Sequence, residues 1–125
     1  MPLHWTISHP DRLVVATCKD RVSLKDIENY LDGVVVAEAL PYAKIFDLSQ
    51  GVLDLGDNDM MLLGARIRAY STTMSVIGPL AIVATSPKGQ EQARLFTALA
   101  DAKRQVRIFR DLQGARQWLA GLTAS

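Results

Sequence analysis

The chain has 125 residues, of which 49% are hydrophobic and 22% are charged, and its formal net charge is +1. This length and composition are typical of a soluble globular protein, so we expect residues 1–125 to form a single domain. The longest uncharged run, Ala69–Pro87, is interrupted by Gly78, Pro79 and several hydroxyl side chains, which excludes membrane insertion. No signal-peptide pattern is visible, and the single cysteine, Cys18, cannot form an internal disulfide. We therefore expect a cytoplasmic protein.

The first half of the chain predicts a hairpin, a helix and a central strand. Residues 3–8 and 12–20 are rich in β-branched side chains and flank the turn HPD, which is typical of a β-hairpin. Ser23, with Asp26 three residues later, forms a variant of the capping box, and apolar residues follow at helical spacing. A helix should therefore begin there and end near the sequence LP. Residues 42–48 (YAKIFDL) are apolar enough for a central strand.

The second half predicts an alternation of helices and strands. The predicted elements are a helix at 60–74, a strand at 78–86, a helix from Ser86 to residue 102, a strand at 105–111, and a helix at 112–122 capped by Asp111. The whole order is β-β-α-β-α-β-α-β-α. Strands that alternate with helices of this length form a mostly parallel sheet. The prediction is a single-domain α/β fold with a mixed sheet, in which the first hairpin adds an antiparallel edge.

Three aspartates lie close together in the segment LDLGDNDMM, which spans Leu53–Met61. Asp57 is a suitable N-cap for the following helix, and Asp59 would lie in its first turn near the positive end of the helix dipole. Each effect typically contributes about 0.5–1 kcal/mol. A calcium loop does not fit, because aspartate occupies the position that requires glycine. Asp54 is left without a structural explanation, and a magnesium site that includes Asp47 stays open.

No set of residues with catalytic spacing is present. His4 and His9 lack further ligands for zinc, Cys18 lies on an apolar strand, and Ser49 lacks the flanking glycines of a nucleophile elbow. We therefore expect a protein that is not an enzyme and that has no metal or cofactor. The basic residues between 103 and 110 are accompanied by a single aromatic side chain, which argues against nucleic-acid binding.

The segment Lys44–Tyr70, KIFDLSQGVLDLGDNDMMLLGARIRAY, resembles the central part of STAS-domain proteins, the SpoIIAA-like anti-sigma-factor antagonists. The order of the other elements fits the same family. In that family the helix begins at an Asp-Ser-Ser-Gly motif, and a partner kinase phosphorylates one of the serines. Here the motif falls on residues 55–58, and Asp57 replaces the serine. The chain therefore resembles stand-alone bacterial SpoIIAA-like proteins that lack the phosphorylation motif, and their fold in turn resembles lipid-carrying CRAL-TRIO domains.

The resemblance implies a non-enzymatic α/β module and does not supply a partner. Together with the acidic segment and the absence of catalytic residues, it leads to the hypothesis of a regulatory module that binds an unidentified protein partner. The contact surface would be the exposed face of the helix Asn58–Tyr70 together with an interaction loop, Ser49–Asp59, formed by Ser49, Asp54, Asp57, Asn58 and Asp59. The alternative is a carrier or sensor of a small apolar or amphipathic ligand between sheet and helices, lined by Met60, Met61, Leu63, Phe96 and Trp118. A metal-dependent hydrolase that uses Asp47, Asp54 and Asp57 ranks last.

A homodimer is a further expectation from the charge pattern. Residues 1–63 hold five basic and ten acidic side chains, whereas residues 64–125 hold nine basic and three acidic ones. Oppositely charged surfaces of this kind favour self-association, although folding can also interleave the two halves and mix their charges. The apolar strand at the sheet edge adds a second surface for a dimer.

Overall fold

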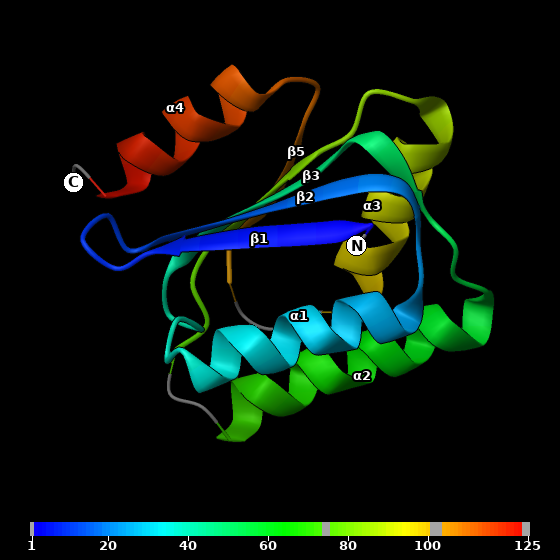
Figure 1. Cartoon of the computed structure of the whole chain (residues 1–125), viewed down its shortest axis with the longest axis horizontal. Helices are drawn as coiled ribbons and strands as arrows, with labels where there is room; N and C mark the ends of the chain where they lie inside the picture. Colours follow the sequence, from blue (N-terminus) through cyan, green and yellow to red (C-terminus); the bar gives the residue numbers. More distant parts are fainter. Residues whose placement is uncertain (1, 74–75, 101–103, 124–125) are drawn as a thin grey trace.

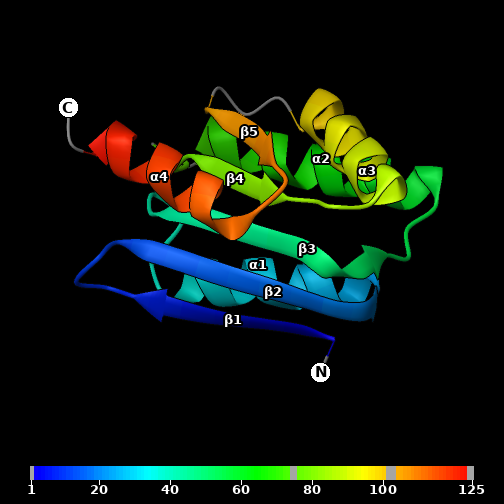
Figure 2. The same cartoon turned by 90° about the horizontal axis from the view of Figure 1, so that it is seen from above.

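A mixed five-stranded sheet forms the centre of the molecule (Figures 1 and 2). The structure is a computed structural model that describes residues 2–73, 76–100 and 104–123. Within these ranges the elements are β1 (Leu3–Ser8), β2 (Leu13–Val22), α1 (Leu24–Val36), β3 (Ala43–Leu53), α2 (Asp57–Thr73), β4 (Leu80–Val83), α3 (Pro87–Leu99), β5 (Val106–Phe109) and α4 (Leu112–Thr123). Residues 74 and 101–102, which the sequence assigns to helices, lie outside the described residues.

The sheet has the order β1-β2-β3-β4-β5. β1 and β2 pair antiparallel, and every other neighbouring pair is parallel. The predicted order of elements, the mostly parallel sheet and the antiparallel edge are therefore confirmed. Among the described residues, no helix combines the length and the apolar character that crossing a bilayer requires.

The helices cover the two faces of the sheet unequally (Figure 1). α1, α2 and α3 pack on one face, and α4 packs on the other. Successive side chains of a strand point to opposite faces. Lys44, Phe46 and Leu48 of β3 therefore face the three helices, whereas Ala43 and Ile45 face α4. This alternation places a lysine on the inner face of a central strand.

Side-chain caps hold the starts of three helices as the sequence predicts. Ser23 and Asp26 form a reciprocal capping box, in which the Asp26 N–H donates to Ser23 Oγ at 3.2 Å and the Ser23 N–H donates to Asp26 Oδ2 at 2.9 Å. Ser86 caps α3, with proline as the first helical residue. Asp111 Oδ1 accepts a hydrogen bond of 2.7 Å from the Gly114 N–H in the first turn of α4. Each cap satisfies a backbone donor that has no partner within its helix.

α1 is shorter than predicted and contains a glycine for a packing reason. The helix ends at Val36 rather than near the following Leu-Pro. A Cβ at Gly33 would lie 2.8 Å from Cζ2 of Trp5, so the glycine allows the indole of β1 to pack against the helix backbone. Gly33 therefore serves the close approach of strand and helix.

β3 is longer than predicted and extends to Leu53, so Ser49 lies in a strand rather than in a loop. β4 pairs only with Lys44–Asp47, and the rest of β3 has no strand on that side among the described residues. At Leu53, the side chain of Gln92 from α3 takes the place of a neighbouring strand. Its Nε2 donates to the Leu53 carbonyl at 2.7 Å, and its Oε1 accepts from the Leu53 N–H at 3.3 Å. One side-chain amide thus makes both hydrogen bonds that a neighbouring strand would make.

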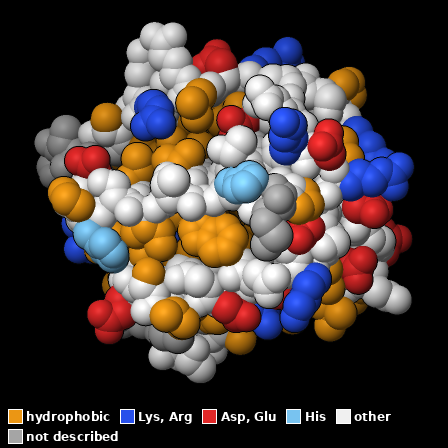
Figure 3. Space-filling view, in the orientation of Figure 1, with side chains coloured by type: hydrophobic (Ala, Val, Ile, Leu, Met, Phe, Trp, Pro, Cys, Tyr) orange, Lys and Arg blue, Asp and Glu red, His pale blue; other side chains and the backbone are white. Residues whose placement is uncertain are grey.

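Acidic and basic side chains are interspersed on the face shown in Figure 3. The charge asymmetry between the two halves of the sequence does not produce a surface of a single sign there. On this face, folding has mixed the charges of the two halves. The charge asymmetry therefore does not support a homodimer that uses this face.

Candidate functional site

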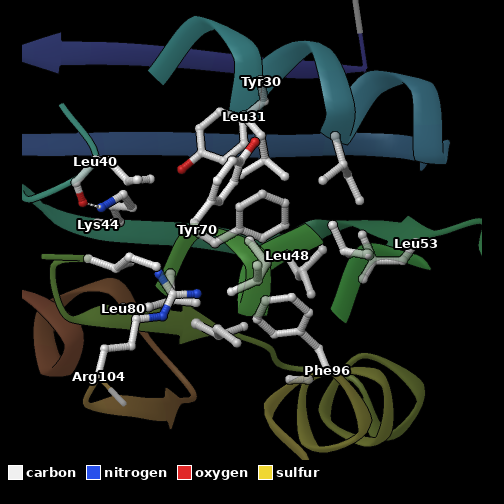
Figure 4. Close-up of a pocket in the computed structure, with 17 residues that line it drawn as sticks. Tyr30, Leu31, Leu40, Lys44, Leu48, Leu53, Tyr70, Leu80, Phe96 and Arg104 are labelled. Atoms are coloured by element: carbon white, nitrogen blue, oxygen red, sulfur yellow. Dashed lines mark hydrogen bonds between the residues drawn. The ribbon is translucent and has the colours of Figure 1, made fainter. Parts of the chain in front are cut away.

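A cavity of about 60 Å³ lies between the sheet and helices α1, α2 and α3 (Figure 4). Its lining is almost entirely apolar and comes from all three helices, from β3 and β4, and from the segment that precedes β5. The lining residues are Ile27, Tyr30, Leu31, Leu40, Lys44, Phe46, Leu48, Leu53, Leu63, Ile67, Tyr70, Ile77, Leu80, Ile82, Ala93, Phe96 and Arg104. Two cationic side chains stand out in this set because such groups are rarely buried without a partner.

Lys44 lies at one end of the cavity and is only 3% exposed (Figure 4). Its amino group donates to the backbone carbonyls of Leu40 and, at 2.7 Å, of Tyr42. Burial, together with the nearby positive charge of Arg104, lowers the pKa of Lys44 from 10.5 to about 7. The charged and neutral forms of this amine therefore lie close in free energy near neutral pH.

Arg104 extends into the same end of the cavity as Lys44 (Figure 4). Its Nε is buried, and it is the one buried side-chain nitrogen or oxygen of the described residues that has no hydrogen-bond partner. Burial lowers the pKa of Arg104 to about 10, and interaction with Tyr30 opposes this effect. The guanidinium thus stays charged at neutral pH. An unsatisfied buried donor typically costs about 1–3 kcal/mol, so it calls for an explanation.

Two tyrosines complete the polar part of the lining. Tyr30 of α1 is buried and packs edge-on against the Trp5 ring, with centroids 5.5 Å apart. Its pKa is raised by burial, so the hydroxyl is neutral. The Tyr70 hydroxyl of α2 lies 3.3 Å from Nη1 of Arg66, which also bonds Asp32 of α1 at 3.0 Å. Arg66 therefore links the two helices that line one side of the cavity.

The five residues predicted to line a ligand site separate into four places. Leu63 and Phe96 line the cavity. Met60 is buried but lines a different, open groove between the starts of α2 and α3. Met61 is 59% exposed, so its placement in the interior is wrong. Trp118 is also misplaced, because α4 carries it to the opposite face of the sheet, where its ring lies 5.6 Å from that of Phe109.

The N-cap of α2 lies one residue earlier in the acidic segment than predicted. The Gly56 carbonyl accepts the Met60 N–H at 3.0 Å, which makes Gly56 the cap and Asp57 the first helical residue. Asp59 lies in the first turn as expected, and its Oδ2 accepts the Gly56 N–H at 3.2 Å. This is the returning half of a capping box, whose other half needs a side-chain oxygen that glycine lacks.

The remaining residues of the predicted interaction loop lie at the surface. Ser49, Asp54, Asp57 and Asn58 are exposed. Asp54 pairs with Arg21 at 3.8 Å, where both side chains are more than half exposed, so this pair contributes little to stability.

The structure does not bring together the carboxylates of the suggested metal site. Asp47 Oδ1 accepts the Ser49 N–H at 2.9 Å, and Asp54 faces Arg21. Over residues 2–73, 76–100 and 104–123, no group of three His, Cys, Asp or Glu side chains is placed to hold a metal ion. Cys18 is buried, and burial raises its pKa to about 12, so its thiol stays protonated.

Sequence reasoning missed Lys44 and Arg104. A signal for Lys44 was present, since a lysine within the apolar strand YAKIFDL must point to one of two covered faces. Arg104 belongs to a basic run that resembles an ordinary solvated surface, and only the folded chain shows that its Nε is buried.

The arrangement of sheet and helices is that of a SpoIIAA-like fold. The chain is similar to the crystal structure of an uncharacterized protein from the DUF3478 family of Shewanella loihica PV-4, which has this fold. The TM-score is 0.62 at 17% identity, over 94% of this chain and 91% of that chain. The resemblance noted for Lys44–Tyr70 is thereby confirmed at the level of the fold. No protein-family profile matches the sequence, and no curated protein matches it.

Proposed function

We propose that the protein is a carrier or sensor of a small, mostly apolar molecule that binds in the cavity between the sheet and helices α1, α2 and α3. The observation that carries this proposal is the cavity itself, which is lined by side chains from three helices and the sheet and is almost entirely apolar. Well-packed interiors rarely keep voids larger than a water molecule.

The size of the cavity limits the ligand. Its volume of about 60 Å³ exceeds the space of one water, whereas sites for drug-sized molecules typically measure about 300–1,000 Å³. The bound molecule is therefore small, or it displaces lining side chains as it enters.

Benzene should raise the melting temperature of the wild-type protein, because a ligand that binds only the folded state stabilises it by mass action. Ala93 of α3 is buried and lines the cavity, so the extra methyl groups of Ala93→Val should fill space and reduce the benzene effect by half or more. Ala65 of α2 is exposed, so Ala65→Val is a matched control that should keep the full effect. Differential scanning fluorimetry over a benzene series measures all three proteins. Equal shifts in wild type and Ala93→Val would place benzene elsewhere and remove the cavity as the site.

A second candidate function, a regulatory protein-interaction module, is favoured by the surface next to the acidic segment. Asp57 and Asn58 are exposed, and their side chains make no hydrogen bond or ion pair with the described residues. Met61 and Leu62, on the next turn of α2, are 59% and 62% exposed. Exposed apolar side chains beside a free carboxylate are typical of a contact surface. Its occupant would be a cytoplasmic protein or a second copy of this chain.

Asp57→Asn should weaken capture of such a partner, because it removes the one carboxylate of the segment that has no partner in the described structure. Asp59 is unsuitable for this test, because its carboxylate accepts the Gly56 N–H. Glu38, an exposed carboxylate beyond the end of α1, supplies the control Glu38→Gln. The measurement is quantitative mass spectrometry of proteins retained by each immobilised variant, with sedimentation velocity for self-association. A partner retained equally by all variants would not use this surface.

A further inference from the structure

We propose that the cavity binds a small amphipathic carboxylate, with its carboxylate between Arg104 and Lys44 and its apolar part toward Phe96 and Leu53. This inference rests on the ligand-carrier function proposed above and names the chemical class of the ligand. It is argued from the unsatisfied donor of Arg104, the free donor of Lys44, the lack of a carboxylate in the lining, and the polarity of the cavity from one end to the other.

The first argument is the donor count at the cationic end. Nε of Arg104 is buried and has no hydrogen-bond partner among the described residues. A protonated Lys44 has three N–H donors, and the carbonyls of Leu40 and Tyr42 use two of them. Both side chains line the same cavity and lie at one end of it (Figure 4). An oxygen anion would accept from both free donors at once.

The second argument is charge. The titratable or charged groups that line the cavity are Lys44 from β3, Tyr30 from α1, Tyr70 from α2 and Arg104 from the segment before β5. No lining residue is an aspartate or glutamate, and α3 contributes no ionisable group to the lining. Lys44 is buried and Arg104 is half-buried, and no described residue of the lining supplies a counter-charge, which destabilises the empty site. A bound anion supplies the missing charge.

The third argument selects a carboxylate with an apolar chain. Away from Lys44 and Arg104, the cavity is bounded by side chains such as Leu48, Leu53 and Phe96 (Figure 4). A polyanion such as phosphate would need more donors than this end offers, and the apolar remainder would be left without contacts. A carboxylate carries one charge, pairs well with a guanidinium, and leaves the chain for the apolar end.

Binding of the anion should also favour protonation of the Lys44 amine. The amine has a pKa of about 7 in the protein, and a neighbouring negative charge favours its protonated form. Carboxylate affinity should therefore be highest below neutral pH and should fall as pH rises and Lys44 becomes neutral. Arg104 stays charged over the same range, so part of the affinity should remain.

Titration with butanoate and with 1-butanol, followed by NMR of backbone amides, tests the assignment. Wild type should bind butanoate about tenfold or more tightly than 1-butanol near pH 6, since hydrogen bonds to charged groups are worth this much. Arg104→Met should reduce that preference several-fold, with the remainder due to Lys44, and should leave 1-butanol binding unchanged. Arg107, an exposed arginine on β5, provides the control Arg107→Met, which should behave as wild type.

The outcomes separate the two proposals. Equal binding of butanoate and 1-butanol by wild type would overturn the carboxylate site and leave the carrier function standing. Failure of butanoate, 1-butanol and benzene to bind would overturn both. Where Arg104→Met does not fold, the wild-type protein still decides, because a preference for butanoate that is the same near pH 6 and near pH 9 would exclude Lys44 from the site.

Discussion

Replacing Gly78 by alanine should lower the melting temperature by roughly 10 °C or prevent folding, which corresponds to a loss of about 3 kcal/mol or more. A Cβ at this position would lie 2.1 Å from the Tyr42 carbonyl oxygen and 2.4 Å from that of Pro41. Real Cβ atoms do not approach oxygens so closely, and both neighbours are backbone atoms that cannot rotate away. The Gly78 N–H also donates to the Leu40 carbonyl at 3.0 Å, so any shift of the backbone breaks this bond.

Gly121→Ala is the matched control. A Cβ at Gly121 meets nothing within 4 Å, and alanine is the better helix former in α4. This variant should therefore be neutral or slightly stabilising. Thermal unfolding followed by circular dichroism compares the two variants with wild type. If Gly78→Ala melted within 2 or 3 °C of wild type, roughly the effect of a mild surface change, the close packing of residues 41–42 on Gly78 would be wrong.

Lys44→Met should stabilise the protein at neutral and acidic pH by an amount on the order of a few kcal/mol, since each unit of pKa shift corresponds to about 1.4 kcal/mol. The lysine is almost fully buried, and methionine fills similar space without a charge. The lost hydrogen bonds to the carbonyls of Leu40 and Tyr42 offset part of the gain, typically about 1 kcal/mol each. The Leu40 carbonyl keeps its bond from the Gly78 N–H.

The advantage of Lys44→Met should depend on pH with a definite sign. Between pH of about 7, the folded pKa of Lys44, and 10.5, its ordinary value, the unfolded state binds more protons than the folded state. The wild type therefore gains stability as pH rises through this window, while the variant does not. The advantage of the variant should be full below the folded pKa and should be lost by the upper limit.

Urea unfolding of both proteins between about pH 6 and about pH 10 measures this difference. Burial also raises the pKa values of Cys18 and Tyr30, which destabilises the folded state at high pH, but both groups are present in each protein and cancel in the comparison. A stability difference that is constant across the window would show that Lys44 keeps its ordinary pKa.

The sequence predicted the order of the elements because the signals for it are local. Ser23 with Asp26, Ser86 with the following proline, and Asp111 each mark a helix start through bonds within four residues. The length of β3 was not predictable in this way. Its second half, SQGVL, has the composition of a loop, and it is a strand because β2 and the Gln92 amide supply its hydrogen bonds. Those partners are distant in sequence.

The candidate site was predictable only in part for the same reason. Helical spacing placed Leu63 and Phe96 on inward faces, and both line the cavity. Met61 lies close to Leu63 on the same helix, but its side chain points outward. The position of Trp118 can be predicted only if it is known which face of the sheet α4 covers. The place of Arg104 in the cavity could not be predicted, because the groups it interacts with, Tyr30 of α1 and Lys44 of β3, are more than 50 positions away in the sequence. Local patterns predict elements, whereas a cavity is a property of their assembly.

The Gln92 amide has a consequence for the behaviour of the protein in concentrated solution. A strand that extends beyond its neighbour presents unpaired backbone groups, and such edges can recruit strands from other molecules into aggregates. The Leu53 N–H and carbonyl belong to such an extension, and both are occupied by the side chain of Gln92. Proline, lysine and bulges are the usual guards of sheet edges. Here a single glutamine from a helix occupies the backbone of Leu53, so we expect a residue that lies on no strand to limit pairing of this edge with other chains.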